Sequence, residues 1–133
     1  MAKYKAPKWP KPMIEFEIPL YGGWVYLYRS PEKIQQAYRY LNVQSLEDPE
    51  GLYDGFAHML IDQSTGARLY LIGWYSDDLT TLAHEASHIA FFILSNAGID
   101  ARDSDGETFC YLLGTILEKL KLNTFNKPRK GKS

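Results

Sequence analysis

Cysteine and long apolar runs are scarce in this chain of 133 residues. The single cysteine, Cys110, excludes a disulfide within one molecule, which is typical of proteins from a reducing compartment. No apolar run approaches the roughly 18 residues that a membrane-spanning helix needs, and the first dozen residues lack the apolar segment of a secretory signal. We therefore expect a cytoplasmic protein of one domain that has no membrane partner.

Basic residues are concentrated at the two ends of the chain. Residues 13–118 hold all 16 acidic residues but only 5 of the 15 basic ones. This pattern predicts a basic, proline-rich and unpacked arm over residues 1–12, a single domain over 13–122 and a basic flexible tail over 123–133. The ends could contact nucleic acid. Solvated ends are the favoured interpretation, because neither carries aromatic residues interleaved on a folded surface.

Hydrophobic periodicity predicts an α+β domain with the element order β-β-α-β-β-α-α. A capping Ser30 followed by Pro31 marks the first helix, and Ser76, Asp77 or Asp78 caps the second. Residues 44–55 are expected to form a polar loop. The predicted strands are 13–18, 24–28, 56–61 and 68–74, and the predicted helices are 31–41, 79–96 and 107–122. A small mixed or antiparallel sheet should pack on the last two helices.

The second predicted helix carries two of the three histidines, in the stretch His84-Glu85-Ala86-Ser87-His88. Residues four apart lie on one helix face, so both imidazoles can point at one metal ion. The pattern H-E-x-x-H is typical of zinc hydrolases, in which the glutamate acts as a general base on zinc-bound water. We expect Zn²⁺ as the cofactor, with His84 and His88 as ligands and Glu85 as the base.

A catalytic zinc site of this kind needs a third protein ligand. Glu107 is favoured, because it opens a helix that should pack back against the motif helix. Asp103 and Asp105, in the preceding loop, are the alternatives. Cys110 is close in sequence, but a small buried apolar role is favoured for it.

The pattern H-E-x-x-H also occurs by chance on amphipathic helices, as a surface histidine pair without metal. Against this interpretation, apolar residues such as Ala83, Ala86, Ile89 and Ala90 surround the motif. Histidines and a glutamate buried there would lose hydration without gaining a partner. Metal binding would offset that cost.

Three segments together resemble a known family. They are Thr81 to His88, Gly98-Ile99, and Asp105-Gly106-Glu107-x-x-x-Tyr111-Leu112-x-Gly114. In this region, residues 79–114, the chain resembles small phage-encoded zinc metallopeptidases of the gluzincin branch. The front half resembles them only in its strand–strand–helix layout. The resemblance implies a zincin-like fold, His84, His88 and Glu107 as zinc ligands, Glu85 as base, a peptide or protein substrate, and the host cytoplasm.

A peptidase also needs a hydrogen-bond donor for the oxyanion of the transition state. Tyr111 is the leading candidate, since it lies four residues after Glu107 on the same helix face, although a packed role is equally open. His58 is a less favoured alternative. The strand 68–74 could present an edge to an extended peptide, with Tyr70 and Tyr75 lining the groove.

A second class of function is also compatible with the sequence. The chain could be a catalytically inactive binding protein on a metallopeptidase-like scaffold. Its basic ends or acidic middle would then hold a host protein or nucleic acid. The two functions differ at Glu85, which is needed for hydrolysis and not for binding.

Overall fold

The computed structural model describes residues 8–43 and 54–125, and side chains as far as Leu120. The chain is an α+β protein with one four-stranded sheet and three helices, as expected. The elements are β1 (Ile14–Glu17), β2 (Trp24–Tyr28), α1 (Pro31–Leu41), β3 (Gly55–Ile61), β4 (Arg68–Trp74), α2 (Leu79–Asn96), the 3₁₀ turn η1 (Asp103–Gly106) and α3 (Glu107–Phe125). None of the described helices is long and apolar enough to cross a membrane.

The sheet is mixed and has the strand order β1-β2-β4-β3. β1 pairs with β2 and β3 pairs with β4, both antiparallel, whereas β2 and β4 are parallel. β4 therefore lies inside the sheet, and the prediction that residues 68–74 present an edge to a peptide is wrong. Of the two strands of the hairpin, β3 is the one at the edge.

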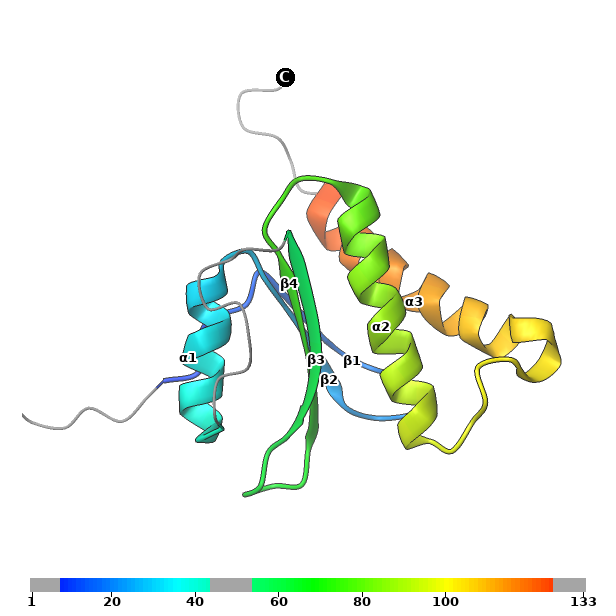
Figure 1. The fold of residues 1–133 in the computed structure, drawn as a ribbon, viewed down its shortest axis with the longest axis horizontal. Helices are drawn as coiled ribbons and strands as arrows, with labels where there is room; N and C mark the ends of the chain where they lie inside the picture. Colours follow the sequence, from blue (N-terminus) through cyan, green and yellow to red (C-terminus); the bar gives the residue numbers. More distant parts are fainter. Residues whose placement is uncertain (1–7, 44–53, 126–133) are drawn as a thin grey trace, which may run out of the picture.

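The helices cover the two faces of the sheet unequally. α1 lies on one face, and α2 and α3 lie on the other (Figure 1). Successive strand residues point to opposite faces, so each strand contributes to two cores. The core under α2 and α3 takes Ile14, Val25, Leu27, Tyr70, Ile72 and Trp74 from the sheet and Ile18 from just after β1, and the core under α1 takes Tyr28, Leu60 and Leu71.

Tyr70 and Tyr75 pack in these two cores, so the prediction that they line a groove for a peptide is wrong. Tyr70 is only 1% exposed, and its hydroxyl accepts a 3.1 Å hydrogen bond from Asn96 at the end of α2. Tyr75 packs with the core under α1, on the other side of the sheet from α2. Neither side chain lines a groove beside the histidines.

α2 begins and ends where local chemistry predicts. Asp78 is the N-cap, and its carboxylate accepts a 2.8 Å hydrogen bond from the amide of Thr80. Gly98 follows the helix in the left-handed conformation, at φ +72°, which costs glycine little. Leu79, which we expected in the core stripe, is instead 51% exposed.

The described part of the basic arm is packed, so the prediction of an unpacked arm is wrong for residues 8–12. Pro10 is buried, and its carbonyl accepts a 2.9 Å hydrogen bond from the hydroxyl of Tyr28. The ring of Trp9 packs edge-on against Tyr26 and Tyr40, with centroids 5.1 and 5.3 Å apart. Aromatic contacts hold this segment together with hydrogen bonds that α1 donates to its carbonyls, from Lys33 to Lys11 and from Gln36 to Lys8. Residues 1–7, most of the predicted loop 44–55, and the tail after Phe125 lie outside the described residues.

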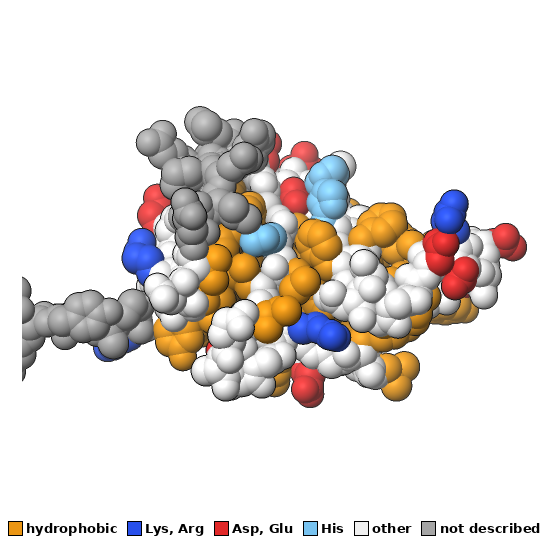
Figure 2. Space-filling view, turned by 60° about the horizontal axis from the view of Figure 1, so that its bottom comes forward, with side chains coloured by type: hydrophobic (Ala, Val, Ile, Leu, Met, Phe, Trp, Pro, Cys, Tyr) orange, Lys and Arg blue, Asp and Glu red, His pale blue; other side chains and the backbone are white. Residues whose placement is uncertain are grey.

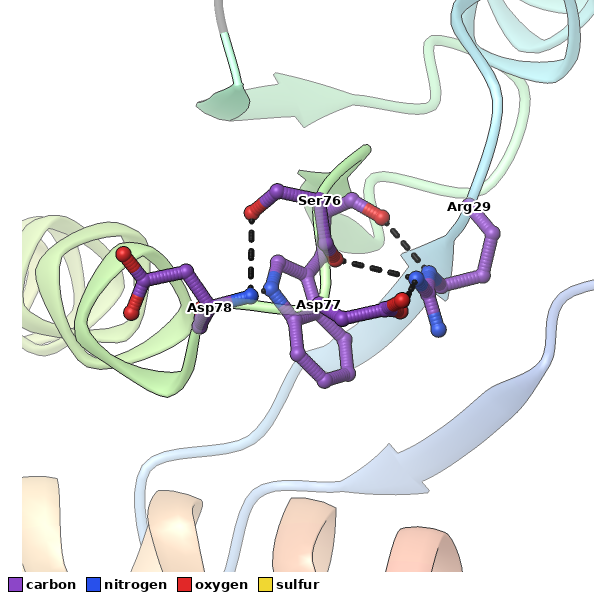
Figure 3. A network of polar contacts seen from close by, with 5 residues as sticks. Arg29, Ser76, Asp77 and Asp78 are labelled. Carbon is purple, nitrogen blue, oxygen red and sulfur yellow. Dashed lines mark hydrogen bonds and ion pairs between the residues drawn. The ribbon is translucent and has the colours of Figure 1, made fainter.

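One arginine ties the end of β2 to the segment between β4 and α2. Arg29 donates hydrogen bonds to the carbonyls of Trp74 (2.7 Å) and Ser76 (2.9 Å) and forms an ion pair with Asp77 (2.7 Å). Its guanidinium also lies 4.3 Å from the centroid of the Trp74 ring. Figure 3 shows how these groups converge just before Asp78. The planar guanidinium thus fixes the start of α2 relative to the sheet.

We expect the Arg29→Ala variant to lower the free energy of unfolding by about 2 kcal/mol, because charged donors to two carbonyls are lost. Urea denaturation measures this change. Arg29→Lys should recover little, since an ammonium group lacks the fork geometry. Asp77→Asn should cost at most about 1 kcal/mol, because the Asp77 side chain is 95% exposed. Equal losses in Arg29→Ala and Asp77→Asn would contradict this account.

Candidate metal centre

The two histidines of α2 are exposed and converge on one point. The Nε2 atoms of His84 and His88 are 3.3 Å apart, and the ring centroids are 4.9 Å apart. This proximity follows from the helix, because residues four apart are stacked on one face. Figure 2 shows histidine side chains standing out from the surface beside hydrophobic groups.

The spacing of the pair fits zinc. Two nitrogens that each lie about 2.05 Å from one tetrahedral zinc ion are roughly 3.3–3.4 Å apart. In the metal-free protein, the same contact is a hydrogen bond between a protonated and an unprotonated ring nitrogen. The histidine pair can therefore donate two ligands to one ion with little rearrangement.

The solvent exposure of the two histidines contradicts the expectation that they are buried among apolar residues. His84 and His88 are exposed on α2, so they do not lose hydration as the apolar neighbours had indicated. Only Glu85 is buried, at 9% exposure. The case for metal binding thus depends on the convergence of the two nitrogens and not on desolvation of the histidines.

Glu85 lies on the inner edge of the site, between α2 and β3. Its carboxylate and the ligand nitrogens of His84 and His88 lie within 4.8 Å of one another, the one such group of possible metal ligands within the described residues. Burial raises the pKa of the Glu85 carboxyl, while the two histidines act in the opposite direction. A raised pKa suits a carboxylate that must hold a proton for part of a reaction.

A pocket of about 340 Å³ opens beside this group. It is lined by Asp54, Gly55, Thr80, Thr81, His84 and Glu85. The start of the edge strand β3 forms one side, and the first turns of α2 form the other. A small substrate segment bound here would contact both the histidine and the carboxylate.

The structure does not bring Glu107 into the histidine group. Glu107 is exposed at the start of α3 and is not among the residues within 4.8 Å of the pair. α3 turns Leu112 and Ile116 into the core, and Phe109 packs on Phe91 of α2 with centroids 4.6 Å apart. Glu107 lies on a different face of α3 from Leu112 and Ile116. Its role as third ligand stays a prediction, and it requires a rearrangement at the start of α3.

The two alternative ligands are also apart from the histidines. Asp103 and Asp105 are exposed in η1, where Asp105 adopts a left-handed conformation at φ 56°.

Cys110 is exposed, so the prediction of a buried apolar role for this thiol is wrong.

Tyr111 lies at a different hollow from the histidines. It is 74% exposed and lines a cavity of about 290 Å³ with Pro19, Leu20 and three other residues of α3. That cavity shares no lining residue with the pocket beside Glu85. The structure therefore does not bring Tyr111 into the pocket beside His84 and Glu85.

His58 is on the opposite side of the sheet from the pair. It belongs to β3 and points toward α1, where its Nδ1 lies 3.0 Å from the hydroxyl of Tyr38. Burial lowers the pKa of His58 and raises the pKa of Tyr38, so both side chains are held neutral. Because His58 faces α1, on the other face of the sheet from α2, the structure does not bring it to the histidine pair as an oxyanion donor.

Four lining residues of the pocket were not identified from the sequence. Thr80 and Thr81 precede His84 and Glu85 by four positions, and this spacing alone could have placed them beside the motif. Gly55 is the first residue of β3 and Asp54 directly precedes it, so both join the site only through tertiary packing.

No protein-family model, curated protein or solved structure matches this chain. The geometry of the site is therefore the basis for its interpretation.

Zinc should stabilise the folded protein. At a free concentration of about 100 times the dissociation constant, Zn²⁺ should raise the free energy of unfolding by about 2.7 kcal/mol, because it binds the folded chain alone. Thermal denaturation with and without zinc measures this gain. His84→Ala and His88→Ala should each lose it, because each removes one of the two converging nitrogens.

Two further variants test the ligand set. His58→Gln should keep the zinc-dependent gain, because His58 lies on the other face of the sheet. The Glu107→Gln variant tests whether Glu107 is the third ligand. It should lose the zinc-dependent gain in stability only if Glu107 reaches the ion. Absence of any zinc effect in the wild-type protein would contradict the metal site itself.

The buried imidazole of His58 makes stability depend on pH. Since its pKa is lowered in the folded protein, the unfolded chain binds the proton more readily. The stabilisation is complete above about pH 6.5, the ordinary pKa of histidine, and is lost as the pH falls below that value. Urea titrations at pH 7.5 and pH 5 should show a smaller acid-induced loss in His58→Gln. An equal loss in both proteins would contradict the assignment.

Proposed function

We propose that the protein is a zincin-like, zinc-dependent peptidase in which His84 and His88 bind the ion and Glu85 is the general base. One observation carries this proposal: two imidazole nitrogens spaced for one ion and the carboxylate of the buried Glu85 lie within 4.8 Å of one another, beside an open pocket. A histidine pair formed by chance would need neither the carboxylate nor the pocket.

Each component has a separate task. Zn²⁺ bound at this position would polarise a peptide carbonyl and lower the pKa of water. A carboxylate oxygen of Glu85 takes a proton from the attacking water and later delivers it to the leaving amine. The partial burial of Glu85 supports this exchange, because it brings the carboxyl pKa closer to neutrality.

The edge of the sheet supports a peptide as the substrate. Among the described strands, β3 pairs with β4 alone, so the main chain of β3 has one edge available. An extended peptide can add to such an edge by main-chain hydrogen bonds. Gly55, at the beginning of β3, and the preceding Asp54 also line the pocket beside Glu85. A peptide that follows β3 would thus be led toward the carboxylate.

The position of Glu107 favours the alternative function. With Glu107 exposed and apart from the pair, the two histidines would bind a metal without Glu107 as a third protein ligand. A two-ligand site binds more weakly and suits a scaffold that has lost catalysis. The alternative protein would bind its partner without hydrolysing it.

Glu85→Gln distinguishes the two functions. The amide cannot take up the proton, so kcat/KM for a library of extended fluorogenic peptides should fall roughly 10²–10⁴-fold. Zinc binding, measured by calorimetry, should persist because both histidines remain.

Glu118→Gln is the matched control, because Glu118 is an exposed glutamate on α3. It should leave both hydrolysis and zinc binding unchanged. A zinc-loaded wild-type protein that hydrolyses no member of the library would overturn the proposal in favour of a binding role.

A further inference from the structure

The start of β3 lies so close to the Glu85 side chain that no space remains there for a side chain on Gly55. A β-carbon added at Gly55 would lie 2.8 Å from both Cγ and Oε2 of Glu85. It would also lie 2.7 Å from the methyl group of Thr81. Carbon atoms in favourable contact are about 3.5–4.0 Å apart. Any side chain at position 55 must therefore displace Glu85, Thr81 or the strand.

Backbone conformation is not the reason for glycine at this position. Gly22, Gly66 and Gly98 adopt positive φ, which disfavours other residues, whereas Gly55 does not. Gly55 is instead an ordinary strand residue that pairs with Trp74. Glycine inside a strand weakens the strand and often marks a close approach of another group. Space for Glu85 and Thr81 is what glycine supplies here.

The strand cannot easily withdraw to make room. The carbonyl of Asp54 accepts a 2.8 Å hydrogen bond from the amide of Tyr75, which holds the first residue of the hairpin in place. Further along β3, Ala57 and Met59 pack against the core that holds α2. The side chains of Glu85 and Thr81 are consequently the groups that would have to move.

We propose that Gly55 is a positioning residue for Glu85: its missing side chain leaves the space in which the carboxylate lies beside the pocket and the histidine pair. This inference rests on the proposed function, since it assigns Gly55 a part in the same reaction. Gly55 lines the pocket but has no side chain that could react, so its part in the reaction is to position the carboxylate.

A thermodynamic cycle tests the contact without any measurement of activity. Gly55→Ala should lower the melting temperature of the metal-free protein, because the new β-carbon overlaps Glu85 and Thr81. In a Glu85→Ala background, the same substitution should cost about half as much or less, because Cγ and Oε2 are gone. Gly114→Ala is the control: a β-carbon there meets nothing within 4 Å, so its effect should be the same in both backgrounds. Equal losses from Gly55→Ala in the two backgrounds would overturn the proposal.

A second set of variants separates positioning from stability. Gly55→Ala should lower kcat at least about tenfold with unchanged Zn²⁺ affinity, since the histidines are not displaced. Adding Thr81→Ser removes the methyl group and should recover part of the melting temperature without recovering kcat. Recovery of both, or an unchanged kcat in Gly55→Ala, would show a structural role alone and would overturn the proposal. A wild-type protein without hydrolysis is a different failure, because it concerns the proposed function while the cycle still reports on Gly55.

Discussion

Burial of one face of α2 against the sheet is the constraint on which the rest of the structure depends. Leu82, Ala86, Ile89, Ala90, Ile93 and Leu94 are buried on this face. Since a helix has a fixed period, that burial decides where every other side chain of α2 points. It turns His84 and His88 to solvent and Glu85 toward β3. The orientation of the site is thus a consequence of the core.

The position of Glu85, the candidate base, is unfavourable for the stability of the fold. Glu85 occupies a position that an apolar side chain would fill with less loss of hydration, and the raised pKa of its carboxyl reflects that loss. A neighbouring strand accommodates it, because Gly55 leaves space for the carboxylate on β3. A buried carboxylate that lowers stability and requires a glycine opposite it is typical of a functional position.

Local features of the chain were predictable because they depend on neighbours in sequence. Pro31 marked the start of α1, although the side chain of Ser30 makes no capping hydrogen bond. An aspartate before Leu79 caps α2, apolar alternation located β1, and aromatic and β-branched residues located β2. The convergence of His84 and His88 was predictable for the same reason, since a four-residue spacing on a helix brings two rings together. By contrast, apolar residues around the motif did not show that the histidines would be exposed.

The sequence by itself determined the elements, their order, and the pairing of the two histidines, because helix and strand periods act over a few residues. Only the tertiary structure decided that β4 is internal, that Tyr70 is core, and that His58 faces α1. The tertiary structure likewise decided that Gly55 lies against Glu85 and that Glu107 lies apart from the pair. These facts depend on strand order and on the rotation of whole helices, which are set by how separate elements share a core and not by spacing along the chain.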